Sequence, residues 1–286
     1  MIRLVLVGAA GRMGRAVEAA AAGATDLRIV ARVDRSENFP GGSGVGGGGG
    51  AGAGMAPGTG VPVKAGAESA DPWSEDVASV ARAGDVVVDF SGPEGARAAA
   101  AACAERGAAL VTGSTGLTAA DEQALRDAAT RVAVLKASNF SLGVAALRQA
   151  LRTALGALPA SWDVEIVERH HRKKVDSPSG TALTLASDVR AARGLPEDAL
   201  RHGRQGAAGP RPAPEVGVHA VRGGTWVGDH LVLLAGEGEW LELRHVAQDR
   251  AAFAHGALAA ARFVANAPAG FYTLEAVLRG PGARGH

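Results

Sequence analysis

The stretch Ile2-Arg-Leu-Val-Leu-Val-Gly-Ala-Ala-Gly-Arg-Met-Gly14 decides the fold of this chain. It begins with a short, mostly apolar run, continues with glycines three residues apart, and leads into an alanine-rich segment. That order predicts a buried strand, a tight turn and a helix. In such a turn, backbone N–H groups at the helix N-terminus can approach a pyrophosphate. The spacing is a variant of the G-x-G-x-x-G pattern, because Ala10 occupies the place of the middle glycine.

Two residues at the end of the next apolar run, 27–33, strengthen this interpretation. Asp34 stands twenty residues beyond Gly14, where a dinucleotide-binding fold places the carboxylate that accepts a hydrogen bond from a ribose hydroxyl. Arg35 follows directly, and its guanidinium can pair with a 2′-phosphate or stack on adenine. The alternative is a plain turn beside a surface ion pair. We therefore predict a dinucleotide site that accepts NADH or NADPH.

The first half of the chain repeats the alternation of strand and helix. Its further apolar runs, separated by alanine-rich segments, are 27–33, 85–90, 108–112 and 132–135. This alternation predicts βαβ units around a doubly wound, Rossmann-type parallel sheet. Ligands of such sheets lie beyond the carboxyl ends of the strands, which makes Gly113-Ser-Thr-Gly116 a second candidate for the site. The alternative is an ordinary turn into a helix capped by Thr118.

The pattern changes after residue 141. Helices are predicted at 141–155 and from 179, and strands at 162–169, 215–221, 229–235 and 239–246. This mixture predicts a second, α+β domain with an open mixed sheet. An alanine-rich helix at 250–264 could return to the first domain. We expect one domain from 1–141 with 251–286, and the other from 142–250.

Between Gly41 and Gly60, twelve of twenty residues are glycine, without apolar periodicity. Such a segment cannot bury a face that would offset the entropy of ordering, so we predict a disordered surface loop. A glycine cradle for phosphate is the alternative. It is disfavoured because no strand leads into the tract and no helix follows it directly.

The overall composition excludes several classes of partner. The 286 residues include 30 basic and 29 acidic side chains, and this near balance disfavours nucleic-acid and membrane-surface partners. The single cysteine, Cys103, cannot form a disulfide within the chain, which fits a reducing compartment. The N-terminal sequence enters a strand without the pattern of a signal peptide, and no run is long enough to span a membrane. We expect a cytoplasmic protein.

A second informative stretch is Glu165-Ile-Val-Glu-Arg-His-His-Arg-Lys-Lys-Val-Asp-Ser-Pro-Ser-Gly-Thr181, which concentrates cations after an apolar strand. Adjacent residues of an extended chain point to opposite sides, so at most one of His170 and His171 is expected to act as a proton donor. Lys174 lies four residues beyond His170 and would supply fixed positive charge.

The end of this stretch predicts the start of a helix. Ser177 has the character of an N-cap and Pro178 that of the first helical residue. The amides of Gly180 and Thr181 would then be unpaired donors at the positive end of a helix dipole, which is an anion site.

Three interpretations of the cluster compete with a small-molecule anion site. A solvated charged face does not need an anion-ready helix start beside it. A metal site is disfavoured because adjacent histidines cannot easily converge on zinc and no cysteine or H-x-x-x-H spacing supports them, so we predict no metal. Nucleic-acid binding lacks interleaved aromatic residues and a basic domain.

Residues 165–182 resemble the signature of the 4-hydroxy-tetrahydrodipicolinate reductase family, also called the dihydrodipicolinate reductase family, of bacterial lysine biosynthesis. Other segments resemble the family in the same order, and together they cover nearly the whole chain: Gly8–Gly14, Val88–Ser91, Gly113–Gly116, Ala137–Ser141, Arg222–Gly224 with Gly228–His230, and His245 with Arg250–Ala254. The glycine tract at 41–60 departs from the family, as does Ser114, where a threonine is common.

The resemblance implies a two-domain enzyme, usually a homotetramer assembled through the sheet of its second, substrate-binding domain. Such an enzyme reduces a cyclic, unsaturated imine dicarboxylate with NADH or NADPH. By resemblance, His170 is the proposed acid and Lys174 the second proton donor. The implied substrate contacts are His171, Ser179, Gly180, Thr181 and Thr115.

The resemblance also implies contacts to the dinucleotide. They are Gly8, Ala9, Ala10, Gly11, Arg12, Met13, Asp34, Arg35, Gly113, Ser114, Thr115, Ala137, Ser138, Asn139 and Phe140. Two alternatives remain: a nicotinamide-dependent oxidoreductase for a different imino or oxo acid, and a dinucleotide-sensing protein without turnover. The second would keep the glycine turn but would not need His170 and Lys174.

Overall fold

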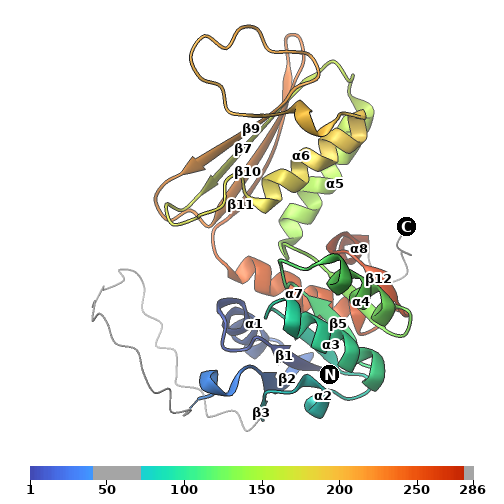
Figure 1. Ribbon diagram of the computed structural model, residues 1–286. Helices are drawn as coiled ribbons and strands as arrows, with labels where there is room; N and C mark the ends of the chain where they lie inside the picture. The colour runs from blue at the N-terminus through green and yellow to red at the C-terminus, as the bar shows by residue number, and fades with distance from the viewer. Residues whose placement is uncertain (41–71, 280–286) are drawn as a thin grey trace, which may run out of the picture.

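The computed structural model describes residues 1–40 and 72–279, and its helices and strands gather around two sheets (Figure 1). The predicted disordered loop at 41–60 lies outside the described residues. None of the helices in these two ranges is long and apolar enough to cross a membrane.

The first sheet has the strand order β12-β6-β5-β4-β1-β2-β3, and all neighbouring strands run parallel. Its strands are β1 (Ile2–Val7), β2 (Leu27–Val33), β3 (Trp73–Ser74), β4 (Val86–Asp89), β5 (Ala109–Thr112), β6 (Ala133–Lys136) and β12 (Gly270–Tyr272). The predicted Rossmann-type sheet is therefore confirmed. The strand order reverses between β1 and β4, and such a switch point opens a ligand crevice at the carboxyl ends of the strands.

Helices cover both faces of this sheet. Three helices pack on one face: α1 (Arg12–Ala22), α7 (Ala251–Val264) and α8 (Leu274–Arg279). Three pack on the other: α2 (Val77–Val80), α3 (Pro93–Arg106) and α4 (Ala119–Ala129). Because the sheet is covered twice, Leu4, Val5 and Leu6 are almost completely buried although they point to alternate faces. The alanine-rich α7 packs into the same core as α1, despite its distance in the sequence.

The second sheet is mixed, with the order β11-β10-β7-β9-β8. Its strands are β7 (Asp163–His170), β8 (Leu200–His202), β9 (Val216–Arg222), β10 (Gly228–Ala235) and β11 (Trp240–Ala247). Strand β10 runs antiparallel to β7 and β11, whereas β9 runs parallel to β7 and β8. The predicted α+β domain with a mixed sheet is confirmed.

Two helices, α5 (Leu142–Ala157) and α6 (Gly180–Arg193), cover one face of this second sheet (Figure 1). Burial alternates along β7, because its even-numbered residues point toward these helices. Ile166 packs there with Leu151 and Leu185. Glu168 and His170 point to the same side, so the pleat itself brings two polar groups into a buried position beside the start of α6.

The helix predicted from 179 is confirmed, but the prediction of Ser177 as its N-cap and Pro178 as its first residue is wrong. Helix α6 begins at Gly180, and Ser179 is its N-cap, because the Ser179 hydroxyl accepts the Ala182 amide hydrogen bond at 3.2 Å. The Ser179 amide is itself bound to the Glu168 carboxylate at 3.0 Å, which fixes the cap position and leaves Pro178 outside the helix. Thr118 caps α4 with a capping box: its hydroxyl accepts from the Asp121 amide at 3.3 Å, and the Asp121 carboxylate accepts from the Thr118 amide at 2.7 Å.

Candidate active site

The glycine turn after β1 has the tight geometry that the sequence predicts. Gly8 has φ +75°, and a Cβ there would lie 2.7 Å from the Phe90 carbonyl oxygen. A Cβ on Gly14 would lie 2.3 Å from the Gly8 carbonyl oxygen, so the first turn of α1 packs directly on the loop. Gly11 is the N-cap of α1. Among the described residues, the amides of Arg12 and Met13 donate to no protein group, so they are available to an anion.

Asp34 lies beside this turn at the end of β2. Its carboxylate accepts hydrogen bonds from the Ala10 amide at 2.9 Å, the Arg35 amide at 2.9 Å and the Asn38 side chain at 2.7 Å. These bonds hold Asp34 against the loop, at the position where a ribose acceptor is needed. The Arg35 side chain is highly exposed and pairs with Glu37 at 3.2 Å. An exposed pair of this kind is weak and leaves the guanidinium able to turn to a phosphate.

A buried carboxylate that the sequence reasoning missed organises the third loop of the site. Asp89 ends β4, is fully buried, and accepts hydrogen bonds from the Ser91 hydroxyl at 2.5 Å and the Thr112 hydroxyl at 2.7 Å. It also accepts from the Ser114 hydroxyl at 2.8 Å, so Ser114 points into the protein and offers a ligand its backbone rather than its side chain. Thr115 is exposed on the same loop.

Aromatic packing fixes the shape of this loop. A Cβ on Gly113 would lie 2.2 Å from the Phe90 ring, so only glycine avoids a steric clash at this position. Phe90 and Phe140 pack edge to face with centroids 5.2 Å apart, and Phe140 is buried. The segments Gly113–Thr115 and Ala137–Phe140 follow β5 and β6, which are hydrogen-bonded neighbours in the sheet. Both therefore emerge at the same carboxyl edge as the glycine turn.

A hydrogen bond connects this edge to the second sheet domain. The Asn139 side-chain amide donates to the Thr181 hydroxyl of α6 at 3.0 Å. The side-chain oxygen of Asn139, Oδ1, accepts a hydrogen bond from the Ser141 amide at 2.8 Å, and this bond orients the Asn139 side chain. The start of α6 therefore lies beside the loop that follows β6. Among the described residues, the amides of Gly180 and Thr181 donate to no protein group, as the sequence analysis expected.

The centre of the second cluster is Glu168, a residue to which the sequence analysis gave no role. Its buried carboxylate accepts from His170 Nδ1 at 2.5 Å, from the Ser179 amide at 3.0 Å and from both terminal nitrogens of Arg222 at 2.7 Å. Because an ionised carboxylate only accepts, His170 must carry its proton on Nδ1. The other ring nitrogen, Nε2, is left to exchange a proton with a ligand. A Cβ on Gly228 would lie 3.2 Å from that nitrogen.

Burial and charge set the protonation of this cluster. Burial alone would raise the pKa of Glu168, but hydrogen bonds from Arg222, His170 and the Ser179 amide together lower it, so the carboxylate is ionised at neutral pH. Burial lowers the pKa of His170. The Glu168 carboxylate opposes this shift, and the charge of Lys174 adds to it. A protonated His170 is therefore a stronger acid than free imidazole.

Lys174 and His171 lie on the turn that follows β7. The Lys174 ammonium pairs with Asp176 at 2.8 Å, and the Asp176 side chain is mostly exposed. The His171 amide donates to the Trp226 carbonyl oxygen, and His171 Nδ1 is buried without a hydrogen-bond partner among the described residues. The two histidines thus have different surroundings, as their opposite directions predict: His170 is fixed by a carboxylate, whereas His171 is not.

Residues 2–140 match the family described as dihydrodipicolinate reductase, N-terminus, and residues 143–278 match dihydrodipicolinate reductase, C-terminus. The chain belongs to the dihydrodipicolinate reductase family. Two curated relatives, both named 4-hydroxy-tetrahydrodipicolinate reductase, extend this finding over nearly the full length. The relative from Anaeromyxobacter sp. strain Fw109-5 is 42% identical over 279 residues, covering 97% of this chain and 98% of the relative. The relative from Nitrosomonas eutropha is 38% identical over 282 residues, with the same coverage.

A solved member of the dihydrodipicolinate reductase family has the same fold. The dipicolinate-bound dihydrodipicolinate reductase from Paenisporosarcina sp. TG-14 superposes with a TM-score of 0.73 at 22% identity, covering 96% of this chain and 99% of that one. The expected fold and family are both confirmed.

The buried histidines of this reductase make an acid-sensitive core. The His230 Nε2 atom and the Ser179 hydroxyl share a hydrogen bond of 3.0 Å. The His230 ring packs edge to face on the His170 ring, with centroids 5.1 Å apart. Burial lowers the pKa of His230 to about 4, so the folded protein binds fewer protons than the unfolded chain between pH 4 and the ordinary histidine value near 6.5. Stability then rises with pH across this window and falls on acidification.

We expect His230 to contribute about 3 kcal/mol to the loss of unfolding free energy between pH 6.5 and pH 4. Denaturant unfolding of the wild type and His230→Gln at several pH values measures this contribution. The variant should be less stable at pH 7, because a fitted buried ring is lost, but its stability should depend less on pH. Parallel pH curves for the two proteins would contradict a neutral buried His230.

Proposed function

We propose that 4-hydroxy-tetrahydrodipicolinate, a cyclic imine dicarboxylate, loses water, and that the chain reduces the resulting unsaturated imine dicarboxylate to tetrahydrodipicolinate with NADH or NADPH, in the diaminopimelate route to L-lysine. The observation that carries the proposal is the buried Glu168–His170 pair at the start of α6, in a chain that belongs to the reductase family along its length. We assign the glycine turn and its neighbouring loops to the dinucleotide, and the His170–Thr181 region to the dicarboxylate.

The residues at the first site fit a dinucleotide. The turn at Gly8 admits a close backbone approach, α1 presents free amides, and Asp34 is held where a ribose hydroxyl would donate. We assign the remaining backbone contacts to Gly113–Thr115 and Ala137–Phe140 at the ends of β5 and β6. When bound, a reduced nicotinamide supplies a hydride. Both cofactors fit, because Asp34 suits a free ribose and the exposed Arg35 suits a 2′-phosphate.

The substrate has two carboxylates, and the second site offers two places for negative charge. The free amides of Gly180 and Thr181 suit one carboxylate. Lys174 and His171 suit the other, with the substrate displacing the exposed Asp176 from the Lys174 ammonium. The cations are concentrated in one short segment because their counterion is a small molecule that arrives from solution and leaves again.

The chain then supports reduction in two ways. Reduction at a carbon conjugated to an imine moves electron density toward nitrogen, so the nearby Lys174 ammonium stabilises the developing charge. His170 is placed by Glu168 with Nε2 free, and in its protonated form it donates a proton at that atom. We therefore assign His170 and Lys174 as the catalytic residues and Glu168 as a positioning residue.

The family assignment is tested by a coupled assay. A synthase generates the unstable substrate in place from pyruvate and aspartate semialdehyde, and the loss of reduced nicotinamide is followed by absorbance. Consumption that requires both precursors supports the proposal. Consumption with a different imino or oxo acid, and none with this substrate, would favour another oxidoreductase of the same scaffold.

Arg35 should discriminate between the two cofactors. We expect Arg35→Ala to raise the KM for NADPH about tenfold and to change the KM for NADH less than twofold, since only NADPH carries the phosphate that a guanidinium binds. Steady-state kinetics with each cofactor measures this difference. Arg82→Ala is the matched control. Arg82 is also exposed, but it precedes β4 and so lies at the amino ends of the strands, away from the proposed site. An equal loss for both cofactors would remove Arg35 as a phosphate contact.

We also propose a homotetramer assembled through the second sheet. Among the residues that the structure describes, no helix covers the face of this sheet opposite α5 and α6. Three large apolar side chains on this face are strongly exposed: Trp240 by 68%, Val246 by 49% and Val221 by 39%. Exposed apolar groups gathered on one face favour association. Sedimentation should then give four times the 28.6 kDa of one chain.

Two further assignments follow from the same proposal. We place the domain division at 1–141 with 251–286 and at 142–250, which is supported by the packing of α7 against α1 in the first core. We also propose a cytoplasmic location. The single cysteine, Cys103, is buried and free, which fits a reducing compartment.

A further inference from the structure

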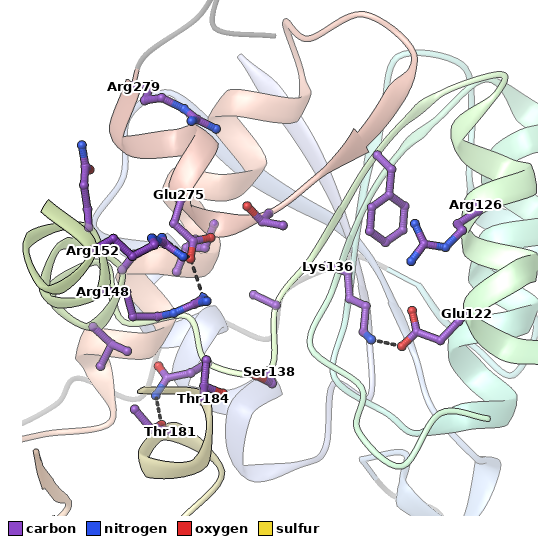
Figure 2. A pocket seen from close by; sticks show the side chains of 18 residues that line it. Glu122, Arg126, Lys136, Ser138, Arg148, Arg152, Thr181, Thr184, Glu275 and Arg279 are labelled. Atoms are coloured by element: carbon purple, nitrogen blue, oxygen red, sulfur yellow. Dashed lines mark hydrogen bonds and ion pairs between the residues drawn. The ribbon is translucent and has the colours of Figure 1, made fainter. Parts of the chain in front are cut away.

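A cavity of about 770 Å³ lies beside the candidate active site, where the carboxyl ends of β6 and β12 meet helices α4, α5 and α8 (Figure 2). Its walls include Ser138, Asn139 and Thr181, which also border the catalytic region. The glycine turn, Asp34, His170 and Lys174 do not line it. The Asn139–Thr181 hydrogen bond at 3.0 Å forms part of its wall, so this cavity adjoins the proposed catalytic site.

Positive charge dominates the walls of this cavity. Its cationic side chains come from four elements: Arg126 of α4, Lys136 of β6, Arg148 and Arg152 of α5, and Arg279 of α8. Its acidic side chains are Glu122 and Glu275. Most other polar groups of the wall are neutral donors or acceptors, such as Gln149 and Thr184. A cavity of this size fits a small molecule, and its charge excludes an apolar one.

Three of the five cations are already matched by carboxylates. Lys136 pairs with Glu122 (Figure 2). Arg148 and Arg152 share two carboxylates, those of Asp188 on α6 and Glu275 on α8. These pairs fix the positions of the side chains but leave no net charge on the wall they form.

Arg126 and Arg279 have no such match. Neither forms an ion pair with a carboxylate among the residues that the structure describes. Arg126 instead stacks on the Phe271 ring, with its guanidinium carbon 4.9 Å from the centroid. This contact holds the guanidinium plane while leaving its N–H groups free. Two unmatched guanidinium groups in the wall of one cavity leave it with a net positive charge, which favours a small anionic molecule.

We propose that this cavity is a second anion site, which binds a small dianion bearing carboxylate or phosphate groups. Arg126 and Arg279 supply the charge, and Ser138, Gln149 and Thr184 supply neutral hydrogen bonds. The ligand would contact α4 and β6 on one side and α5 and α8 on the other. Asn139 and Thr181 belong both to this wall and to the border of the catalytic region, so the two sites share part of their lining.

Titration calorimetry with two probes, inorganic pyrophosphate and glutarate, tests the site at constant ionic strength. We expect saturable binding of at least one probe to the wild type. Arg126→Gln and Arg279→Gln should each weaken it about tenfold, the effect of losing one charge-assisted contact. Arg82→Gln, which removes an equal charge at the opposite edge of the sheet, should change the affinity less than twofold. Lys174→Ala should keep the component of binding that Arg126→Gln and Arg279→Gln weaken, and should affect only binding at the proposed catalytic site.

Each outcome decides the proposal. Binding of pyrophosphate alone identifies a phosphate-bearing ligand, binding of glutarate alone a dicarboxylate, and binding of both a site selective for charge. The proposal would be overturned by an absence of saturable binding or by equal affinities in Arg126→Gln and Arg82→Gln. It would also be overturned if Lys174→Ala lost the component of binding that Arg126→Gln weakens. Circular dichroism confirms that each variant is folded. The titration measures no turnover, so its failure would leave the reductase proposal intact.

Discussion

Replacing Lys174 by alanine is expected to lower kcat by a factor of about 100 to 10,000, and His170→Ala to lower it by a similar factor. In the proposed mechanism, Lys174 provides the fixed charge that stabilises electron density moving to the substrate nitrogen, and His170 provides the proton at Nε2. Both act mainly in the transition state, so kcat should fall more than the KM for the cofactor rises. Steady-state kinetics in the coupled assay measures both parameters.

Lys173→Ala is the matched control for this experiment. Lys173 is the adjacent residue, carries the same charge and is exposed, whereas Lys174 is partly buried against Asp176. The control should keep kcat within twofold of the wild type. Lys174→Arg separates the two roles of the lysine, because arginine keeps the charge but does not release a proton near neutral pH. Normal turnover in both Lys174→Ala and His170→Ala would show that the catalytic assignment is wrong.

Glu168→Gln is expected to produce the second large effect, about a 10-fold to 100-fold fall in kcat together with a loss of about 3 kcal/mol of stability. Glutamine offers one acceptor oxygen where Glu168 offers two. It therefore cannot satisfy His170, Arg222 and the Ser179 amide at once. The Arg222 charge then loses its carboxylate, and His170 loses the partner that fixes its tautomer.

The pH dependence separates a positioning role from a merely structural one. Glu168 opposes the lowering of the His170 pKa, so its removal should lower that pKa further. The limb of the kcat profile that reports His170 should therefore move to lower pH in Glu168→Gln. Glu165→Gln is the control, since Glu165 also binds several cations from β7 but lies on the opposite face of the strand. An unshifted profile in Glu168→Gln would limit Glu168 to a structural role.

The nucleotide half of the molecule could be predicted from the sequence because its signals are local. The glycine turn, the strand before it and Asp34 lie within 35 residues, and the structure brings Asp34 within 2.9 Å of the Ala10 amide. The parallel sheet followed from the alternation of apolar runs and alanine-rich helices.

The supporting carboxylates were missed because their partners come from different elements. Asp89 binds hydroxyls that follow β4 and end β5, and no spacing in the sequence shows this. The role of Glu168 could have been predicted from the sequence. Residues two apart on a strand share a face, so Glu168 lies beside His170. Ser177 was chosen as the helix cap from its position before Pro178. The structure uses Ser179, because the buried Glu168 binds the Ser179 amide.

The most direct test is a crystal structure of this chain with a reduced cofactor and the substrate analogue dipicolinate. We expect one carboxylate of the analogue to accept hydrogen bonds from the Gly180 and Thr181 amides, and the other to bind Lys174 in place of Asp176. The analogue ring should lie against the nicotinamide, within reach of His170 Nε2. A dipicolinate bound elsewhere, with Lys174 still paired to Asp176, would contradict the proposed site.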